Sequence, residues 1–169
     1  MQQAEIYTNW VNNKKQGKKS LAVLIDPDKA NEKYLNMLCI KANKGFINYF
    51  FVGGSLLSTN SLDAVVSYLK INSSIPVVLF PGNTMQVNLK ADAILFLSLI
   101  SGRNADLLIG KHVEVASLIY DSALEKISTG YILVDGGKAT SVSYMSNSFP
   151  IPKDKPEIAL ATAMAGNML

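Results

Sequence analysis

The chain has 169 residues, of which 49% are hydrophobic and 17% are charged, a composition typical of a globular domain with a sizeable core. This balance excludes a disordered chain. The formal net charge is only +3, and the lysines are scattered without a dense basic block interleaved with aromatic residues, so nucleic acid is not expected as a partner.

The sequence shows no targeting or membrane signal. The stretch Met1 to Ile6 has neither a basic n-region nor an apolar h-region, so no signal peptide is predicted. The longest apolar runs, such as residues 93–100, are too short to cross a bilayer. The only cysteine, Cys39, shares helical spacing with Leu35 and Ala42, which indicates a core position in a reducing compartment. We therefore expect a cytoplasmic protein.

Hydrophobic periodicity predicts an alternation of helices and strands, which implies parallel strands joined by right-handed crossovers. In chain order the predicted elements are a leading helix around 6–11 that ends in the basic tract 14–19, a strand at 21–25, a helix at 30–43, a strand at 49–52, a helix at 62–69, a strand at 76–80, a helical link at 85–90, a strand at 93–97, a helical region at 105–119, a strand at 131–134, a long ordered loop at 141–152 and a last helix at 157–169.

The number of strands limits the choice of fold. A (β/α)8 barrel needs about 250 residues, and five strands do not close one. The alternatives are an open doubly wound sheet and the first part of a longer barrel. The leading helix, the long later loops and the helical ending at 163–169 favour the barrel. The prediction is an α/β chain of the TIM-barrel class, with residues 1–169 forming one partial domain of about five βα units that lacks strands six to eight.

The first strand ends at two acidic residues. The apolar run Leu21 to Ile25 is typical of a strand buried on both faces, and Pro27 stops its ladder between Asp26 and Asp28. Two carboxylates at the end of a strand can hold a divalent cation through oxygen ligands. The alternative is a loop with two solvated acids, one of which caps the helix beginning near Ala30.

Polar or glycine-containing segments follow all five predicted strands. In a parallel sheet or barrel these strand ends converge on one face, where α/β enzymes build their sites. The segments are Asp26 with Asp28, 53–55, 81–83, 98–104 and 135–138.

An ordered set of motifs carries a specific resemblance. The motifs are Leu24-Ile-Asp-Pro-Asp-Lys29, Phe51-Val-Gly-Gly-Ser55, Val78-Leu-Phe-Pro-Gly-Asn83, Gly110-Lys-His112, Gly130-Tyr-Ile-Leu-Val-Asp-Gly-Gly137 and Asn147-Ser-Phe-Pro-Ile-Pro152. In this order and spacing, the chain resembles the geranylgeranylglyceryl phosphate synthase family, which includes the bacterial PcrB-type heptaprenylglyceryl phosphate synthases. The resemblance runs from the first strand to Leu169.

The resemblance implies a Mg²⁺-dependent prenyltransferase that joins a polyprenyl diphosphate to sn-glycerol 1-phosphate in the first ether-bond step of archaeal-type lipid synthesis. It implies Asp26 and Ser55 as metal ligands, and a homo-oligomer in the full-length form. It also implies substrate-binding roles for a further set of residues, namely Gly54, Asp28, Asn83, Lys111 and His112.

The chain departs from the family pattern in two respects. Leu24 stands where some members carry a basic residue. The family's strand-six Tyr/Glu motif, with the presumed general base, and its later glycine-rich phosphate loops are expected beyond Leu169. We therefore expect residues 1–169 alone to be inactive and poorly soluble, because an unfinished barrel exposes sheet edges.

Each implied site residue has a structural alternative. Asp28 can instead cap a helix, Asn83 can stabilise its loop, and Lys111 and His112 can hold surface or packing positions. Two other functions remain open: another phosphate-handling TIM-barrel enzyme, and a non-catalytic binding module with an acidic pocket. A receiver-type module is disfavoured because it needs an Asp after the third strand, where this chain has Pro81-Gly82-Asn83.

Overall fold

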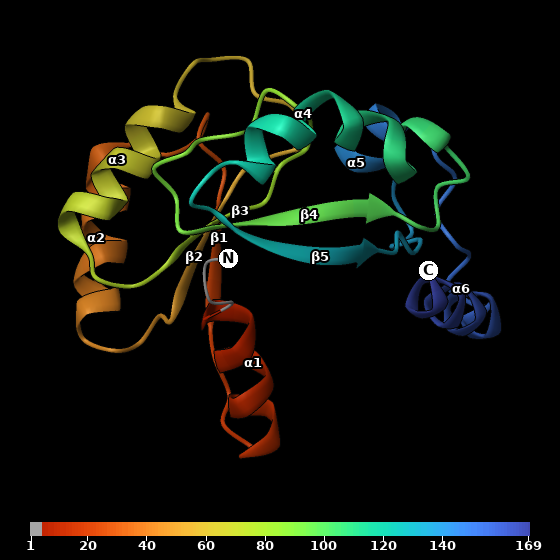
Figure 1. Cartoon of the computed structure of the whole chain (residues 1–169), viewed down its shortest axis with the longest axis horizontal. Helices are drawn as coiled ribbons and strands as arrows, with labels where there is room; N and C mark the ends of the chain where they lie inside the picture. The colour runs from red at the N-terminus through yellow and green to blue at the C-terminus, as the bar shows by residue number, and fades with distance from the viewer. Residues whose placement is uncertain (1–4) are drawn as a thin grey trace. The chain divides into compact units, whose positions relative to one another are not determined.

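The computed structural model describes residues 5–169. Most of the segment Met1 to Ile6, in which no signal peptide is predicted, lies outside the described residues. The described residues form two compact units, one made of residues 5–95 and 121–127 and the other of residues 96–120 and 128–169. The prediction of one partial domain stays a prediction. The elements are α1 (Glu5–Lys15), β1 (Ala22–Ile25), α2 (Glu32–Asn43), β2 (Tyr49–Val52), α3 (Leu62–Asn72), β3 (Val77–Leu79), β4 (Ala93–Leu99), the π-helical turn η1 (Asp106–Gly110), α4 (Lys111–Tyr120), β5 (Glu125–Tyr131), α5 (Ser141–Ser146) and α6 (Pro156–Met168) (Figure 1).

The strands form one parallel sheet in the order β1-β2-β3-β4-β5. The pairs β1/β2, β2/β3 and β3/β4 are parallel, and Leu24 lies opposite Phe51 in the first of them. The Glu125 N–H donates to Asp92 O, and the Ile100 N–H donates to Tyr131 O. The residue numbers of the partners rise together along the two strands, so β5 is parallel to β4. The predicted parallel α/β architecture is therefore confirmed.

In the first unit, helices cover one face of the sheet. Figure 1 shows α2 and α3 side by side next to the first strands. Alternate strand residues point toward them and are almost completely buried, because a strand presents every second side chain to the same face. These residues are Ile25, Phe50, Val52, Val77 and Leu79, and helix residues such as Leu38, Cys39, Val66 and Leu69 pack with them in the core.

The opposite face of the same strands carries an aromatic row. The Trp10 ring lies edge-on to Tyr49 at 5.6 Å and is tilted against Phe51 at 6.1 Å, and Phe51 stacks on Phe80 at 6.2 Å. Leu24, which pairs with Phe51, is 54% exposed. This face is thus apolar but only partly covered, and α1 contacts it through Trp10.

The helix α1 is fixed at its first turn and at its middle. Both carboxylate oxygens of Glu125, the first residue of β5, accept hydrogen bonds at 2.8 Å from the Ile6 and Tyr7 N–H groups. These N–H groups lie in the first turn, where helical donors lack internal partners and a negative charge is favourable. Trp10 anchors the middle of the helix to β2.

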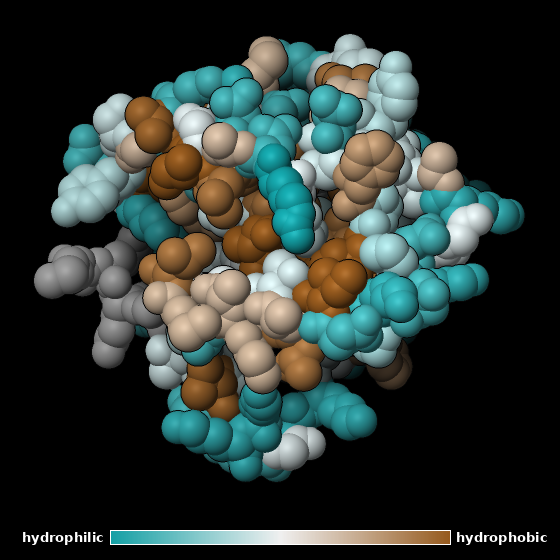
Figure 2. Space-filling view, turned by 90° about the vertical axis from the view of Figure 1, so that its right-hand side faces the viewer, coloured by the Kyte–Doolittle hydropathy of each residue, from teal (hydrophilic) through white to brown (hydrophobic). Residues whose placement is uncertain are grey.

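The second unit contains the end of β4, α4, α5 and α6. The Leu133 N–H donates to Ser101 Oγ at 2.9 Å, and Asn104 Nδ2 donates to the Ser146 carbonyl at 3.2 Å. Figure 2 shows apolar residues between polar ones on the face that it draws. Within residues 5–169, no helix is both long and apolar enough to cross a bilayer.

Three predicted elements differ from the structure. The fifth strand is Glu125–Tyr131 and not 131–134, so the polar residues before Tyr131 form the strand. The link at 85–90 contains turns and no helix. The predicted loop at 141–152 begins with α5, whose N-cap Thr140 forms a reciprocal capping box with Ser143.

The approach of β2 to β3 generates a first prediction. A Cβ atom at Gly53 would lie 1.9 Å from the backbone oxygen of Phe80, and neither backbone can move without breaking the ladder. We expect Gly53→Ala to destabilise the chain by about 3 kcal/mol or more. Urea unfolding followed by circular dichroism measures this effect. Gly136→Ala is the matched control, because nothing lies within 4 Å of its added Cβ. Equal stability of the two variants would contradict the prediction.

Candidate functional site

The carboxylate of Asp26 lies directly after β1. Its Oδ1 accepts the Asp28 N–H at 3.1 Å, which fixes the carboxylate relative to the turn that follows. Its Oδ2 lies 2.7 Å from the Lys29 ammonium, whose side chain is 82% exposed. The ion pair raises the pKa of Lys29 through the hydrogen bond to Asp26 and its negative charge. A cationic group therefore already occupies one face of this carboxylate.

The ends of β2 and β3 meet beside Asp26. A Cβ at Gly54 would lie 3.5 Å from Asp26 Oδ1, so this carboxylate packs against the Gly54 backbone. A Cβ at Gly82 would lie 2.2 Å from the Gly54 oxygen and 3.0 Å from Ser55 Cα. The glycines allow this close approach because they carry no side chain. The structure thus brings Asp26, Gly54 and Ser55 together, as the strand-end argument predicted.

A buried glutamine holds the ends of β2 and β3 together. Gln86 is 2% exposed, and its Oε1 accepts the N–H groups of Gly54 at 3.2 Å and Gly82 at 3.1 Å. Its Nε2 donates to the Gly54 carbonyl at 2.7 Å. One side chain therefore satisfies three backbone groups that have left their strands, which positions Gly54 and the following Ser55.

Asp28 holds the loop after β2. Its Oδ2 accepts the Ser58 N–H at 2.6 Å and the Ser58 hydroxyl at 2.7 Å. Its Oδ1 accepts the Thr59 N–H at 3.3 Å, the Thr59 hydroxyl at 2.5 Å and the Ser61 hydroxyl at 3.2 Å. The hydroxyl of Thr59 and then the donors of Ser58 lower the pKa of Asp28 far below its ordinary value. Both oxygens are therefore used by the 58–61 loop.

The alternative role considered for Asp28, as a helix cap, is wrong. The N-cap of α2 is Asn31, whose Oδ1 accepts the Tyr34 N–H at 2.9 Å. Asn83 makes the local contact foreseen for it, because its Oδ1 accepts the Met85 N–H at 2.9 Å and thereby stabilises its own turn. Substrate-binding roles for Asp28 and Asn83 stay predictions.

Lys111 and His112 belong to the second unit and open α4. The Lys111 ammonium pairs with Glu114 at 2.6 Å, which raises the pKa of Lys111. His112 is 8% exposed, its ring lies edge-on to Phe96 at 4.5 Å, and its Nε2 is 3.4 Å from Ser98 Oγ. Its Nδ1 is buried without a partner in the described chain. These contacts fit packing, and the substrate-binding roles stay predictions.

The donor chemistry around Asp26 suits Mg²⁺. Mg²⁺ prefers oxygen and commonly takes one or two protein ligands, with water and phosphate completing its shell. Asp26 Oδ2 contacts only a solvent-exposed ammonium, which a metal ion can replace, and the half-buried Ser55 hydroxyl makes no hydrogen bond within residues 5–169. Within residues 5–169, no three or more His, Cys, Asp or Glu side chains form a cluster that could hold a metal ion. A metal ion at Asp26 would therefore have few protein ligands.

Two positioning residues were missed by sequence reasoning. Asn31 carries a readable signal, because Asn before an acidic residue is typical of a helix start. Gln86 carries no such signal in the sequence. Its partner Gly54 is 32 residues away, and no local sequence pattern indicates that a glutamine will be buried.

Comparison with known proteins gives one consistent family. The profile of the PcrB family matches residues 13–169. A protein of Chitinophaga pinensis named geranylgeranylglyceryl phosphate synthase is 54% identical over 165 residues, which cover 98% of this chain and 66% of that protein. A protein of the same name from Korarchaeum cryptofilum is 40% identical over 149 residues, covering 88% of this chain and 61% of the relative.

A solved structure agrees with these relatives. It is (S)-3-O-geranylgeranylglyceryl phosphate synthase from Thermoplasma acidophilum in complex with its substrate sn-glycerol-1-phosphate. It superposes with a TM-score of 0.85 at 26% identity, over 99% of this chain and 66% of that one. The chain thus spans slightly less than two thirds of the length of these proteins, and its strands match the corresponding part of their TIM barrel.

The Asp28 contacts generate a second prediction. Asp28→Asn replaces one acceptor oxygen by a donor amide that faces N–H and O–H groups, so we expect the midpoint of thermal unfolding at pH 7 to fall by roughly 3 to 8 °C. The pKa of Asp28 is lower in the folded state than in the unfolded state, where it is about 3.9. The contribution of Asp28 to folding stability is therefore fully present above the unfolded pKa and is lost as the pH falls through the folded pKa.

Thermal unfolding of both proteins between pH 7 and pH 2 measures this difference. It should persist to about pH 4 and shrink below it. The exposed Asp121→Asn serves as the control for loss of one negative charge. A difference that disappears already between pH 7 and pH 5 would rule out this account of Asp28.

Gln86 generates a third prediction. Gln86→Ala removes three hydrogen bonds from buried or partly buried backbone groups, so we expect a loss of about 2 to 4 kcal/mol in unfolding free energy. Denaturant unfolding measures it, with the exposed Gln16→Ala as the control. A loss no larger than that of the control would show that the amide is not needed at this junction.

Proposed function

The chain belongs to the PcrB family, and on this premise we propose that the protein is a Mg²⁺-dependent prenyltransferase. Its substrates are a polyprenyl diphosphate of the geranylgeranyl type and sn-glycerol 1-phosphate, and its product is the first ether of archaeal-type lipid synthesis. The observation that supports the proposal best is the convergence of Asp26, Gly54 and Ser55 at the ends of adjacent parallel strands.

The reaction transfers the prenyl group from one oxygen to another. The primary hydroxyl oxygen of glycerol phosphate attacks C1 of the prenyl chain, the C1–O bond to diphosphate breaks, and diphosphate leaves with the bonding electrons. The hydroxyl proton passes to a general base, which the family resemblance places beyond Leu169. Asp26, Gly54 and Ser55 would serve the diphosphate side of this reaction.

Asp26 and Ser55 would hold the metal ion through a carboxylate and a hydroxyl oxygen. Bound Mg²⁺ neutralises charge on a leaving diphosphate. Gln86 keeps Gly54 against Gly82, so that Gly54 stays next to the Asp26 carboxylate, and Ser55 follows Gly54 directly in the chain. Lys29 lies on the same carboxylate, and once released from it the ammonium is free to bind a phosphate oxygen.

The remaining assignments belong to the same proposal. Gly54, Asn83, Lys111 and His112 are proposed to contact substrate, while Asp28 acts near the site by holding the 58–61 loop. The enzyme is proposed to be cytoplasmic and, in its full-length form, a homo-oligomer. Residues 1–169 by themselves are expected to bind diphosphate without turnover.

Binding is therefore the appropriate test. We expect geranylgeranyl diphosphate to bind the 169-residue chain in the presence of Mg²⁺, and Asp26→Asn to weaken this binding at least tenfold, which corresponds to about 1.4 kcal/mol. Isothermal titration calorimetry with and without Mg²⁺ measures both effects. The exposed Asp121→Asn controls for the charge change.

Two results would refute the proposal. One is equal affinity for the diphosphate with Mg²⁺ and with a chelator. The other is an Asp26→Asn variant that binds as tightly as the unsubstituted chain while Asp121→Asn also leaves the affinity unchanged.

A further inference from the structure

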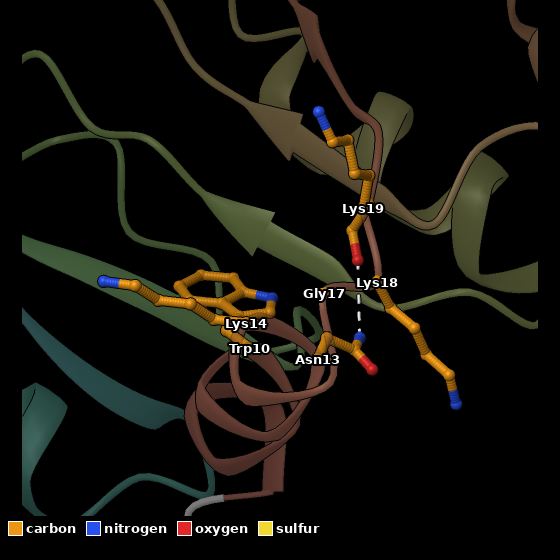
Figure 3. Close-up of a pocket in the computed structure, with 7 residues that line it drawn as sticks. Trp10, Asn13, Lys14, Gly17, Lys18 and Lys19 are labelled. Carbon is orange, nitrogen blue, oxygen red and sulfur yellow. Dashed lines mark hydrogen bonds between the residues drawn. The ribbon is translucent and has the colours of Figure 1, made fainter.

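A pocket lies at the other end of β1 from Asp26, where α1 turns into the strand (Figure 3). It has a volume of about 350 Å³. Its polar and aromatic lining comes from Trp10, Asn13, Lys14, Lys18, Lys19 and Ser20. The whole pocket belongs to the first unit. We refer to it as the basic pocket.

The charge of the basic pocket is uncompensated. Three of its lining residues are lysines, and no acidic side chain lines it. The ion pairs of the described chain involve Lys29, Lys70, Lys90 and Lys111, and none of them involves a lysine of this pocket. The three lysine side chains diverge from the turn (Figure 3), and an anion in the pocket attracts their ammonium groups toward one point.

The frame that carries these lysines is ordered. The Gly17 N–H donates to the Lys14 carbonyl at 3.1 Å and the Lys18 N–H to the Asn13 carbonyl at 2.9 Å, which closes the helix end. Gly17 has φ of +68°, the left-handed conformation that glycine adopts most readily at this position. The Asn13 amide donates to Ser20 Oγ at 3.4 Å across the turn, as the dashed line in Figure 3 shows.

Trp10 supplies a fixed aromatic wall. It is half-buried and held by Tyr49 and Phe51, so its ring does not need to be ordered when a ligand binds. In Figure 3, Lys14 extends along the indole, whereas Lys18 and Lys19 extend away on different sides of the turn. The ammonium groups are thus mobile donors on long stems around a rigid centre.

We propose that the basic pocket binds a phosphate ester, with the lysines on the phosphate and Trp10 against the organic part. Ammonium groups act as point charges that suit the three oxygens of a phosphate, while the pocket contains no arginine fork for a planar carboxylate. Its volume exceeds that of one phosphate ion, which leaves room for an ester group beside the indole.

Two sources provide this chemistry, namely a soluble phosphomonoester and the headgroup of an anionic phospholipid. A polynucleotide is disfavoured, since the net charge of +3 and the single cluster do not form a basic track along the surface. The pocket lies at the opposite end of β1 from Asp26, so binding here is separate from the proposed prenyl diphosphate site.

The protein contains its own probe, because Trp10 is its only tryptophan. Three ligands are titrated against Trp10 fluorescence at constant ionic strength: glycerol 2-phosphate, vesicles of phosphatidylglycerol with phosphatidylcholine, and a single-stranded oligonucleotide. Equilibrium dialysis of radiolabelled glycerol 2-phosphate repeats the first titration without relying on fluorescence. All measurements use the 169-residue chain.

The variant is Lys18→Gln with Lys19→Gln, and the matched control is Lys153→Gln with Lys155→Gln, which removes the same charge from exposed residues outside the pocket. We expect saturable binding of a phosphate ligand, weakened at least tenfold in the first double variant and unchanged in the control. Far-UV circular dichroism verifies that both variants fold.

The outcomes separate the sources. Saturation by glycerol 2-phosphate supports a soluble ester, and a response to anionic vesicles alone supports a lipid headgroup. The proposal is overturned if neither ligand binds, if both double variants lose affinity equally, or if the oligonucleotide binds and both phosphate ligands fail.

Discussion

The contact on which the candidate site depends is the close approach of two backbones where β2 and β3 end. Gly53 lies against the Phe80 carbonyl and Gly82 against the Gly54 carbonyl, at separations that leave no room for a Cβ atom. Backbone groups in such a place need hydrogen-bond partners, and Gln86 supplies them from a buried position. The position of Ser55, and with it any site shared with Asp26, follows from this junction.

The two acidic residues after β1, Asp26 and Asp28, have different interactions and different roles. Asp28 has both oxygens occupied by donors of the 58–61 loop, so it is a poor candidate for a ligand. Asp26 keeps one oxygen on an exposed lysine that can move away. The two carboxylates lie two residues apart and are alike in sequence terms. Only their partners distinguish a positioning residue from a candidate metal ligand.

The sequence predicted those features that depend on local patterns. Apolar runs located β1, β2, β3 and β4, and the rule that parallel strand ends converge brought Asp26 and Gly54 together in advance. The prediction was wrong for β5, because Glu125 to Gly130 has little apolar character and the run at 131–134 is a stronger strand signal. The helix α5 was missed because its capping box uses Ser143 in place of the usual acidic or amide residue.

The partners of Asp28 and Gln86 were beyond prediction for a different reason. The loop partners of Asp28 and the Gly54 partner of Gln86 lie about 30 residues away in the chain, and a single sequence does not reveal such contacts. Ser58, Thr59 and Ser61 are ordinary loop residues until the fold brings them to a carboxylate.

The cap that Glu125 places on α1 has a consequence for the order of assembly. The contact joins residues 119 positions apart, so it closes almost three quarters of the chain into one loop. During synthesis on the ribosome, α1 emerges first but gains its carboxylate partner only after β5 has been made. Until then, its first-turn amides lack this partner and Trp10 has only β2 to pack against. The earliest helix of the chain is therefore among the last to be secured, and nascent chains shorter than about 125 residues should leave it open to proteases.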